Sequence, residues 1–325
     1  MGSEKQQRGG LLRADFFAAI AISSLTFLAA ALSPVLGSIA IVFAPLPILY
    51  YRAKYGSLQG LAILGAALLI AGTLTKISGT GMNPIILLLP GFLGFGLWEL
   101  LKRRLSLEKT VISAVSVLAG FGFLILLIRY LGTGETARHL IENYIAASLQ
   151  EGIRSYTQLG ISAEQIALIK ETAGQITRIM TLIFPGLALV GAAFTVWINV
   201  LAAKMLFQIR DLPFPDLGDL AQWKAPERLV WALIAAGGSF FLPQEWIKFT
   251  GLNILIVCFF VYLLQGLSIV SFLFKRKGIP SGIRAMLYIL LVLQQYLLLP
   301  VIFVGLFDLW IDFRKYIKPT KGVLT

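Results

Sequence analysis

Charged residues are scarce in this sequence. Asp, Glu, Lys and Arg make up 14% of its 325 residues and hydrophobic residues make up 58%, whereas a soluble domain carries about 25% charged residues. The mean hydropathy is +0.83, and apolar runs long enough to span a bilayer recur along the chain. The composition therefore excludes an ordinary soluble domain. It predicts an all-α, polytopic transmembrane helical bundle that forms a single integral membrane domain over residues 1–325.

Residues that carry chemistry are also scarce. The chain has one cysteine, Cys258, and one histidine, His139, so an internal disulfide is excluded, and neither residue has neighbours at metal-ligand spacing. The sequence contains no P-loop, no HExxH, no CxxC and no recognisable Ser/His/Asp set. We therefore predict that the chain is not an enzyme, and we expect no catalytic residues, no metal and no cofactor.

The apolar runs predict about nine membrane helices, within a range of eight to ten. They lie at 14–33, 36–51, 58–75, 84–101, 110–130, 176–206, 229–243, 252–274 and 285–311. The last run contains Pro300, which leaves two interpretations. It is either one long kinked helix or a tight hairpin, whose halves would each span only ~20 Å of a ~30 Å hydrocarbon core. The two interpretations place the C-terminus on opposite sides of the membrane.

Basic residues orient the chain in the membrane. Seventeen of them lie in the N-terminal segment or after the second, fourth, sixth and eighth expected helices, whereas the short opposite connections hold Lys76 and Lys248. Cytoplasmic loops carry such an excess of Lys and Arg. The N-terminus is therefore expected in the cytoplasm, in a multi-pass protein of the bacterial inner (cytoplasmic) membrane. The net charge of +12 then reflects contact with a lipid bilayer and not with nucleic acid.

Segment 132–175 differs from the apolar runs around it. Its acidic residues outnumber its basic residues by two, and its apolar residues recur mostly three or four apart, as on one face of a helix. Ser162 and Gln165 form a capping-box pattern that begins a second helix. We expect an extracytoplasmic amphipathic helical hairpin. It either covers a binding site or partner surface, or it lies on the membrane interface.

Polar side chains inside the expected helices are the candidates for function. Amides join helices by hydrogen bonds or line a pocket for a solute, and the candidate solute-lining residues are Asn199, Asn253, Gln265 and Gln294. A charge cluster at the end of the last helix comprises Asp308, Asp312 and Arg314. The two aspartates lie four residues apart, on one helical face. They could share a proton or hold a cation, or the cluster is an interfacial helix end whose charges balance each other.

A Pro-rich cytoplasmic loop is expected at 207–228. Prolines stiffen it, and its aromatic residues could anchor it at the level of the lipid headgroups. Its acidic residues offset its bases, so it does not resemble a grip for phosphate or nucleic acid. The candidate partner-binding residues in this loop are Phe214, Trp223, Lys224 and Pro226.

The stretch LPFPDLGDLAQWKAPERLVW at 212–231, preceded by INVLAAKML, carries a family resemblance. With the closing GLFDLWIDFR at 305–314, it resembles the YybS-like family of bacterial integral membrane proteins (DUF2232-type), whose function is unknown. APLPILYYRAKYGSLQGLAI at 44–63 is loosely similar to the substrate-binding S components of energy-coupling-factor transporters. That second resemblance implies only a related fold.

Two functions remain open for such a chain. The first is small-solute binding or uptake, as in an energy-coupling-factor S component, with a small-molecule ligand between helices and separate partner subunits that hydrolyse ATP. The alternative is a membrane scaffold or assembly factor, which recruits cytoplasmic or membrane partners through its basic loops. A polar cavity reached by the four amides would favour the first, and a stable cytoplasmic partner would favour the second.

The orientation can be tested with reporter fusions. We expect a green fluorescent protein fused after residue 105 to be fluorescent and an alkaline phosphatase fused there to be inactive, because that loop is basic and should be cytoplasmic. Fusions within 132–175 should behave in the opposite way. The same pair of reporters at the C-terminus decides between nine and ten crossings, and an active phosphatase after residue 105 would contradict the orientation.

Overall fold

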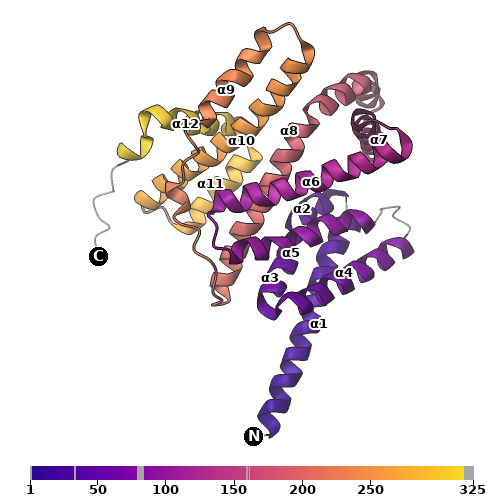
Figure 1. Cartoon of the computed structure of the whole chain (residues 1–325), viewed down its shortest axis with the longest axis vertical. Coiled ribbons are helices and arrows are strands. Elements are labelled where there is room, and N and C mark those ends of the chain that lie inside the picture. The colour runs from indigo at the N-terminus through magenta and orange to yellow at the C-terminus, as the bar shows by residue number, and fades with distance from the viewer. Residues whose placement is uncertain (1, 33, 79–83, 159, 161, 318–325) are drawn as a thin grey trace. The chain divides into compact units, whose positions relative to one another are not determined.

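The computed structural model describes residues 2–32, 34–78, 84–158, 160 and 162–317. Every regular element in these ranges is a helix (Figure 1), which confirms the predicted all-α class. The chain divides into two compact units. The first comprises Met1–Gly122 and Gly191–Leu217, and the second comprises Phe123–Val190 and Gly218–Thr325. Two long helices, α6 and α8, contribute to both units.

The first unit is built around α1 and its neighbours. Its helices are α1 (Gly2–Leu32), α2 (Pro34–Phe43), α3 (Pro45–Tyr55), α4 (Ser57–Ile77), the 3-10 turn η1 (Pro84–Leu87), α5 (Leu88–Lys102), the first part of α6 (Leu107–Thr133) and the end of α8 (Ala163–Ile209). Phe27, Ile48 and Ile63 are buried together in its core. Helix α3 also packs closely on α5, because Gly94 lies against the backbone of Pro45.

The second unit is built around α10 (Glu245–Arg276). Its other elements are the end of α6, α7 (Ala137–Gln158), the first part of α8, η2 (Leu220–Gln222), α9 (Leu229–Gly238), η3 (Ser239–Phe241), α11 (Ser281–Leu293), η4 (Gln295–Leu297), α12 (Leu298–Ile311) and η5 (Phe313–Lys315). Helices α9 and α12 both pack against α10. Gly266 and Gly305 meet where α10 and α12 touch, so their backbones approach closely.

Five described helices are long and apolar enough to cross a membrane. They are Asp15–Leu32, Ser57–Ile77, Leu107–Thr133, Glu164–Ile209 and Glu245–Arg276. A bent pair formed by α11 and α12 raises the number to six if it counts as one span. The predicted nine crossings are therefore not confirmed. Apolar runs that looked continuous are divided into short helices, as at Pro45, which occupies the first turn of α3 where its missing N–H is harmless.

The last apolar run is broken at Gln294. Its φ of −102° and ψ of 83° end α11, and the two arms of the run meet at a bend of 100°. This bend lies between the straight path of a kinked helix and the full reversal of a tight hairpin, so neither interpretation is confirmed. Pro300 does not cause the bend, because it lies in the first turn of α12, where a helix tolerates proline.

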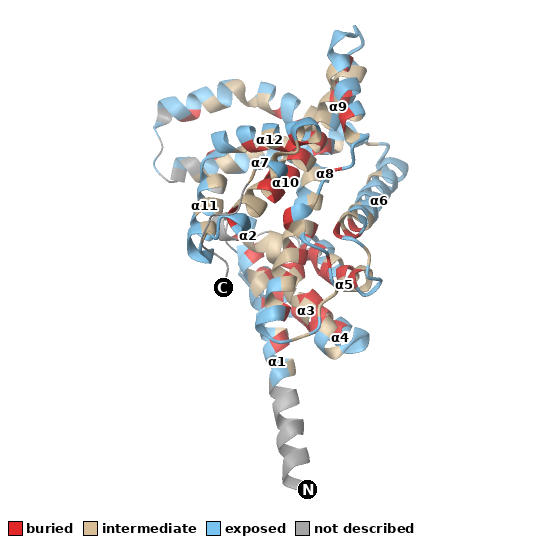
Figure 2. Cartoon of the chain, turned by 90° about the vertical axis from the view of Figure 1, so that its left-hand side faces the viewer, coloured by how far each residue is buried: buried red, intermediate tan, exposed pale blue. Residues whose placement is uncertain are grey.

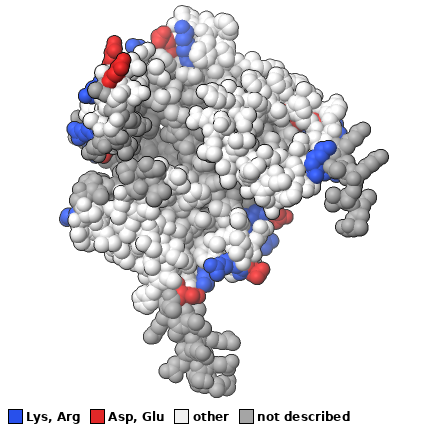
Figure 3. Space-filling model, turned by 180° about the vertical axis from the view of Figure 1, so that it is seen from behind, with Lys and Arg blue, Asp and Glu red and all other residues white. Residues whose placement is uncertain are grey.

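Large apolar side chains cover much of the surface. Only 6% of the residues in the apolar window of α6 are buried, and Figure 2 shows this helix exposed along most of its length. On the face drawn in Figure 3, most of the described surface carries no charge. Contiguous apolar surface of this extent is unusual for a soluble monomer. It is what the lipid tails of a bilayer would cover.

Helix α7 and the start of α8 occupy the segment expected to form a hairpin. Gly160 lies between them with a φ of +77°, a conformation that glycine adopts readily. The backbone N–H of Gln165 donates to Ser162 Oγ over 3.4 Å, as the capping-box pattern predicts. The packing of these two segments as a hairpin and their position outside the membrane stay predictions.

The glycine contact between α10 and α12 yields a stability prediction. A Cβ at Gly305 would collide with the Tyr262 carbonyl oxygen and the Gly266 nitrogen. Gly305→Ala should therefore lower the free energy of unfolding by about 1–3 kcal/mol through overpacking, and the thermal unfolding temperature should fall with it. Gly237 in α9 has no neighbour within 4 Å of its Cβ position. Gly237→Ala is the matched control, and it should be neutral or stabilising by up to about 1 kcal/mol. Equal losses in the two variants would contradict the close contact.

Candidate functional site

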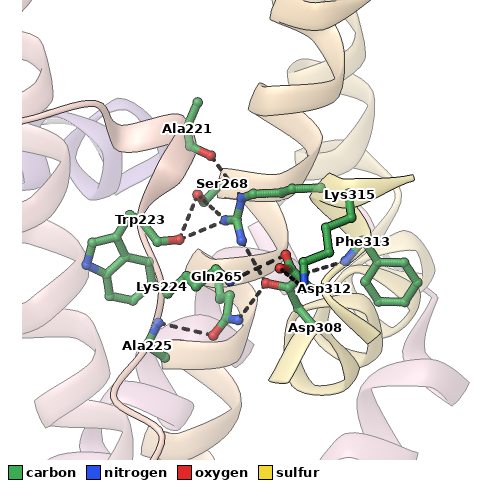
Figure 4. Close-up of polar contacts among 11 residues, drawn as sticks. Ala221, Trp223, Lys224, Ala225, Gln265, Ser268, Asp308, Asp312, Phe313 and Lys315 are labelled. Carbon is green, nitrogen blue, oxygen red and sulfur yellow. Dashed lines mark hydrogen bonds and ion pairs between the residues drawn. The ribbon is translucent and has the colours of Figure 1, made fainter. Parts of the chain in front are cut away.

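A buried carboxylate lies near the C-terminal end of α12. Asp308 is 2% exposed. Its Oδ2 atom accepts from Arg314 Nη1 over 2.7 Å and from Gln265 Nε2 over 3.1 Å. Its Oδ1 atom accepts from the backbone N–H of Phe313 over 2.9 Å. Figure 4 shows these groups converging from α10 and α12. We call Asp308, Arg314, Gln265 and Ser268 the Asp308 network.

A turn at the end of α12 brings Arg314 to Asp308. Asp312 ends the helix in the left-handed conformation, with a φ of +48° and a ψ of 66°. Aspartate tolerates this conformation better than most residues do. The short helix η5 then runs back, so that the guanidinium of Arg314 reaches a carboxylate six residues earlier in the chain.

The guanidinium of Arg314 also binds the Pro-rich loop. Its Nη2 atom donates to the carbonyl of Trp223 over 2.8 Å and to Ser268 Oγ over 2.9 Å, and its Nε atom donates to the carbonyl of Ala221 over 3.3 Å. Ser268 Oγ donates to the Trp223 carbonyl as well, over 3.0 Å. One arginine therefore joins α12, α10 and the loop (Figure 4).

The loop runs antiparallel to α10. Ala225 N–H donates to Gln265 Oε1 over 3.1 Å, Trp223 pairs with Ser268 as above, and Lys275 Nζ donates to Asp219 Oδ1 over 2.7 Å. As the residue number in the loop falls from 225 to 219, the number of the contacting residue in α10 rises from 265 to 275. The Lys275 ammonium lowers the pKa of the Asp219 carboxyl below its usual value, since it donates a hydrogen bond to the charged form.

An outer ion pair lies next to the Asp308 network. The Asp312 carboxylate pairs with Lys224 Nζ over 3.4 Å and with Lys315 Nζ over 3.3 Å, and both lysines are exposed. The two aspartates at the end of α12 thus have separate partners, because the helix ends at Asp312 and turns its side chain away. Within the described residues, no group of three or more His, Cys, Asp or Glu could hold a metal ion.

The structure does not bring the four candidate amides together. Asn199 is buried in the first unit, where its Nδ2 atom donates to the Val42 carbonyl over 2.6 Å. Gln265 belongs to the Asp308 network, and Gln294 is exposed at the bend between α11 and α12. The interpretation of these amides as a common solute lining stays a prediction.

Asn253 bonds to the backbone of α8 next to Pro185. Its Oδ1 atom accepts from the N–H of Gly186 over 2.6 Å, and its Nδ2 atom donates to the carbonyl of Leu182 over 2.8 Å. These two backbone groups are four residues apart, as are the donor and acceptor of one helical hydrogen bond. They lie on either side of Pro185, the proline inside α8. The amide thus joins α10 to the backbone of α8 at this turn.

The candidate partner-binding residues are mostly engaged within the chain. Phe214 packs on Phe207 with ring centroids 5.1 Å apart, in the first unit. The carbonyl of Trp223 accepts a hydrogen bond from Arg314, and Lys224 forms an ion pair with Asp312. Pro226 is exposed. Only part of this predicted surface is therefore available to another molecule.

Sequence reasoning missed two buried residues, Ser268 and Arg52, that take part in polar contacts. Ser268 lies three residues after Gln265, on the same helical face, and that spacing was the available signal. In the first unit, Arg52 is 5% exposed and pairs with Glu99 over 2.8 Å. It also donates to the Phe95 carbonyl and stacks over the Phe95 ring at 3.7 Å. Nothing in the sequence spacing connects positions 52 and 99.

Several apolar helices long enough to span a bilayer, together with the buried ion pair of Asp308 and Arg314, define a polytopic helical membrane protein. A family model described as "Predicted membrane protein (DUF2232)" matches residues 21–309, so the chain belongs to that family. It is also similar to "Uncharacterized protein YybS" of Bacillus subtilis (strain 168), with 21% identity over 291 residues, covering 88% of this chain and 91% of the relative. No solved structure matches the chain.

These findings confirm the predicted YybS-like family. They do not show the looser resemblance to energy-coupling-factor S components. The membrane class is established by the same findings, whereas the kind of membrane and the side on which the N-terminus lies stay predictions.

A double-mutant cycle tests the Asp308–Arg314 pair. The side chains are 0% and 9% exposed, so Asp308→Asn or Arg314→Gln alone should cost roughly 3–5 kcal/mol by leaving one charge buried without its partner. The double variant should lose much less than the sum of the two single losses. The measurement is thermal unfolding of the detergent-purified protein, with the exposed Glu227→Gln as a control that should change little. Additive losses would show that the two charges do not interact.

Proposed function

We propose that this membrane protein binds and moves a small polar solute, and that the Asp308 network forms the binding region. One observation supports this function best: an ion pair is buried beside a non-helical stretch of backbone, between two helices of a membrane protein. Ionisable groups inside membrane segments are rare and usually mark solute or ion pathways. Non-helical backbone beside them is a feature of binding sites in transport proteins.

The chemistry of the network suits a polar ligand. Arg314 binds four acceptors at once, and three of them belong to segments other than α12. A ligand with carboxylate or carbonyl oxygens would compete for this fork of donors, because a guanidinium binds such groups in pairs. Gln265 would accept or donate beside it. This proposal keeps Gln265 from the predicted lining residues and leaves out Asn199 and Asn253, whose bonds hold helices together.

A scaffold function has weaker support. It would need the Pro-rich loop to offer its aromatic residues to a partner, but Phe214 packs on Phe207 and the Trp223 carbonyl is bound by Arg314. Lys224 and Pro226 remain exposed, which leaves a small surface. Association surfaces usually depend on buried aromatic anchors and not on isolated rim charges.

Native mass spectrometry of the detergent-purified protein separates the two functions. We expect the wild-type protein to carry a small-molecule adduct that is not a lipid, and we expect the Asp308→Asn/Arg314→Gln double variant to lose it. The control is Asp219→Asn, whose native carboxylate lies in the loop and pairs with Lys275 in the last turn of α10, and it should keep the adduct. Retention of the adduct by the double variant would reject the Asp308 network as its site. A stoichiometric protein subunit without any small molecule would favour a scaffold.

A further inference from the structure

Helix α9 with η3 is too short to cross a bilayer. The apolar stretch Leu229–Phe241 has 13 residues, which extend for about 21 Å, whereas the hydrocarbon core is ~30 Å thick. The α10 helix beside it has 32 residues and extends for about 48 Å. About a third of the membrane thickness is therefore left for another part of the chain to cross.

Residues 220–228, which comprise η2, the irregular residues 223–226 and a turn, come directly before the start of α9. Near the opposite end, a Cβ at Gly251 would lie 2.8 Å from the carbonyl of Ala236. Further along α10, Ala225 is hydrogen-bonded to Gln265 and Trp223 is hydrogen-bonded to Ser268. The last contact is the ion pair between Asp219 and Lys275. Residues 219–241 thus form one continuous antiparallel neighbour of α10, whose α-helix begins only at Leu229.

The residues of α10 that contact 220–228 indicate how deep this segment lies in the membrane. Its apolar sequence runs from Leu252 to Phe274, between Lys248 and Lys275. Gln265 lies nine residues before Phe274, which places it about 14 Å inside that end of the run. A loop resting on the membrane surface would meet α10 near Lys275 only. The contacts of Ala225 with Gln265 instead carry the segment toward the middle of the bilayer.

We propose that residues 220–241 form a single membrane crossing, whose first part, 220–228, lies within the bilayer thickness outside any α-helix and faces a water-filled vestibule. The vestibule opens at the end of α10 that carries Lys275. This architecture does not depend on any bound solute, so it stands or falls separately from the function proposed above.

Backbone hydrogen bonding fits this crossing. Extended backbone at membrane depth is tolerated only where it is buried in protein or lines water. On the side facing α10, Ala221 and Ala225 are buried, and Arg314, Ser268 and Gln265 bind the backbone groups of 221, 223 and 225. These three side chains therefore satisfy backbone groups that a regular helix would satisfy with its own hydrogen bonds.

Charged side chains on the other side call for water. Lys224, Glu227 and Arg228 are exposed, and they flank the residue that pairs with Gln265. A charged side chain in contact with lipid tails at this depth is costly, and such residues normally face a protein interior or a water-filled cavity. A vestibule open to solvent provides the hydration that these three residues require.

Single-cysteine labelling tests both parts of the proposal. Cys258 is the one cysteine of the chain, so the Cys258→Ala background carries only the introduced thiol. Glu227→Cys is the test position, Lys277→Cys in the turn after α10 is the headgroup-level control, and Met286→Cys on an exposed apolar position of α11 is the lipid-facing control. If Cys258→Ala lowers the yield of folded protein, the buried Cys258 is kept and its labelling is subtracted.

Two readouts are measured in liposomes that contain the full-length protein. A bimane attached at position 227 should be quenched more by lipids with a nitroxide in the middle of the acyl chain than by lipids with a headgroup nitroxide, and a bimane at position 277 should show the reverse order. A charged, membrane-impermeant methanethiosulfonate should react at positions 227 and 277 several-fold faster than at 286. Headgroup-level quenching at 227 would overturn the crossing. A deep but unreactive thiol at 227 would overturn the vestibule.

Discussion

The ion pair between Asp308 and Arg314 holds together three segments that are distant in the sequence. Asp308 belongs to α12, Arg314 reaches it from the turn that follows, and the same guanidinium binds carbonyl groups of the Pro-rich loop. An arginine can do this because its five donors point in fixed directions. Burying the pair removes two charges from water, so its stability depends on every remaining hydrogen bond being made. The pair thus joins α12, α10 and the loop through one set of polar contacts.

A similar arrangement recurs in the first unit. Arg52 is buried, pairs with Glu99 and donates to a backbone carbonyl of α5. Each unit therefore uses one arginine to bind a carboxylate and a peptide group simultaneously. A guanidinium suits such positions better than an ammonium does, because it is more weakly hydrated and stays charged when buried.

The class of fold could be predicted because it depends on amino-acid composition, which can be read without knowing which distant residues contact each other. The crossing number could not, because an apolar run does not say where a helix stops: Pro45 starts a new helix, whereas Pro185 lies within a continuous one. Of the candidate site, Asp308 and Gln265 were singled out as polar residues in apolar surroundings. Their pairing was not predicted, because a single sequence carries no signal that joins position 265 to position 308. Ser268 was missed since a lone serine in a membrane helix is common.

Asn253 ties the motion of two helices together. Its amide binds the N–H of Gly186 and the carbonyl of Leu182, on either side of Pro185. Withdrawal of α10 from α8 would therefore break two hydrogen bonds to the backbone of α8, and bending of α8 at that turn would pull on α10. A proline within a helix is one of the recognised causes of helix bending. The proline turn and the asparagine together make a mechanical joint, in which the angle of one helix sets the position of the other.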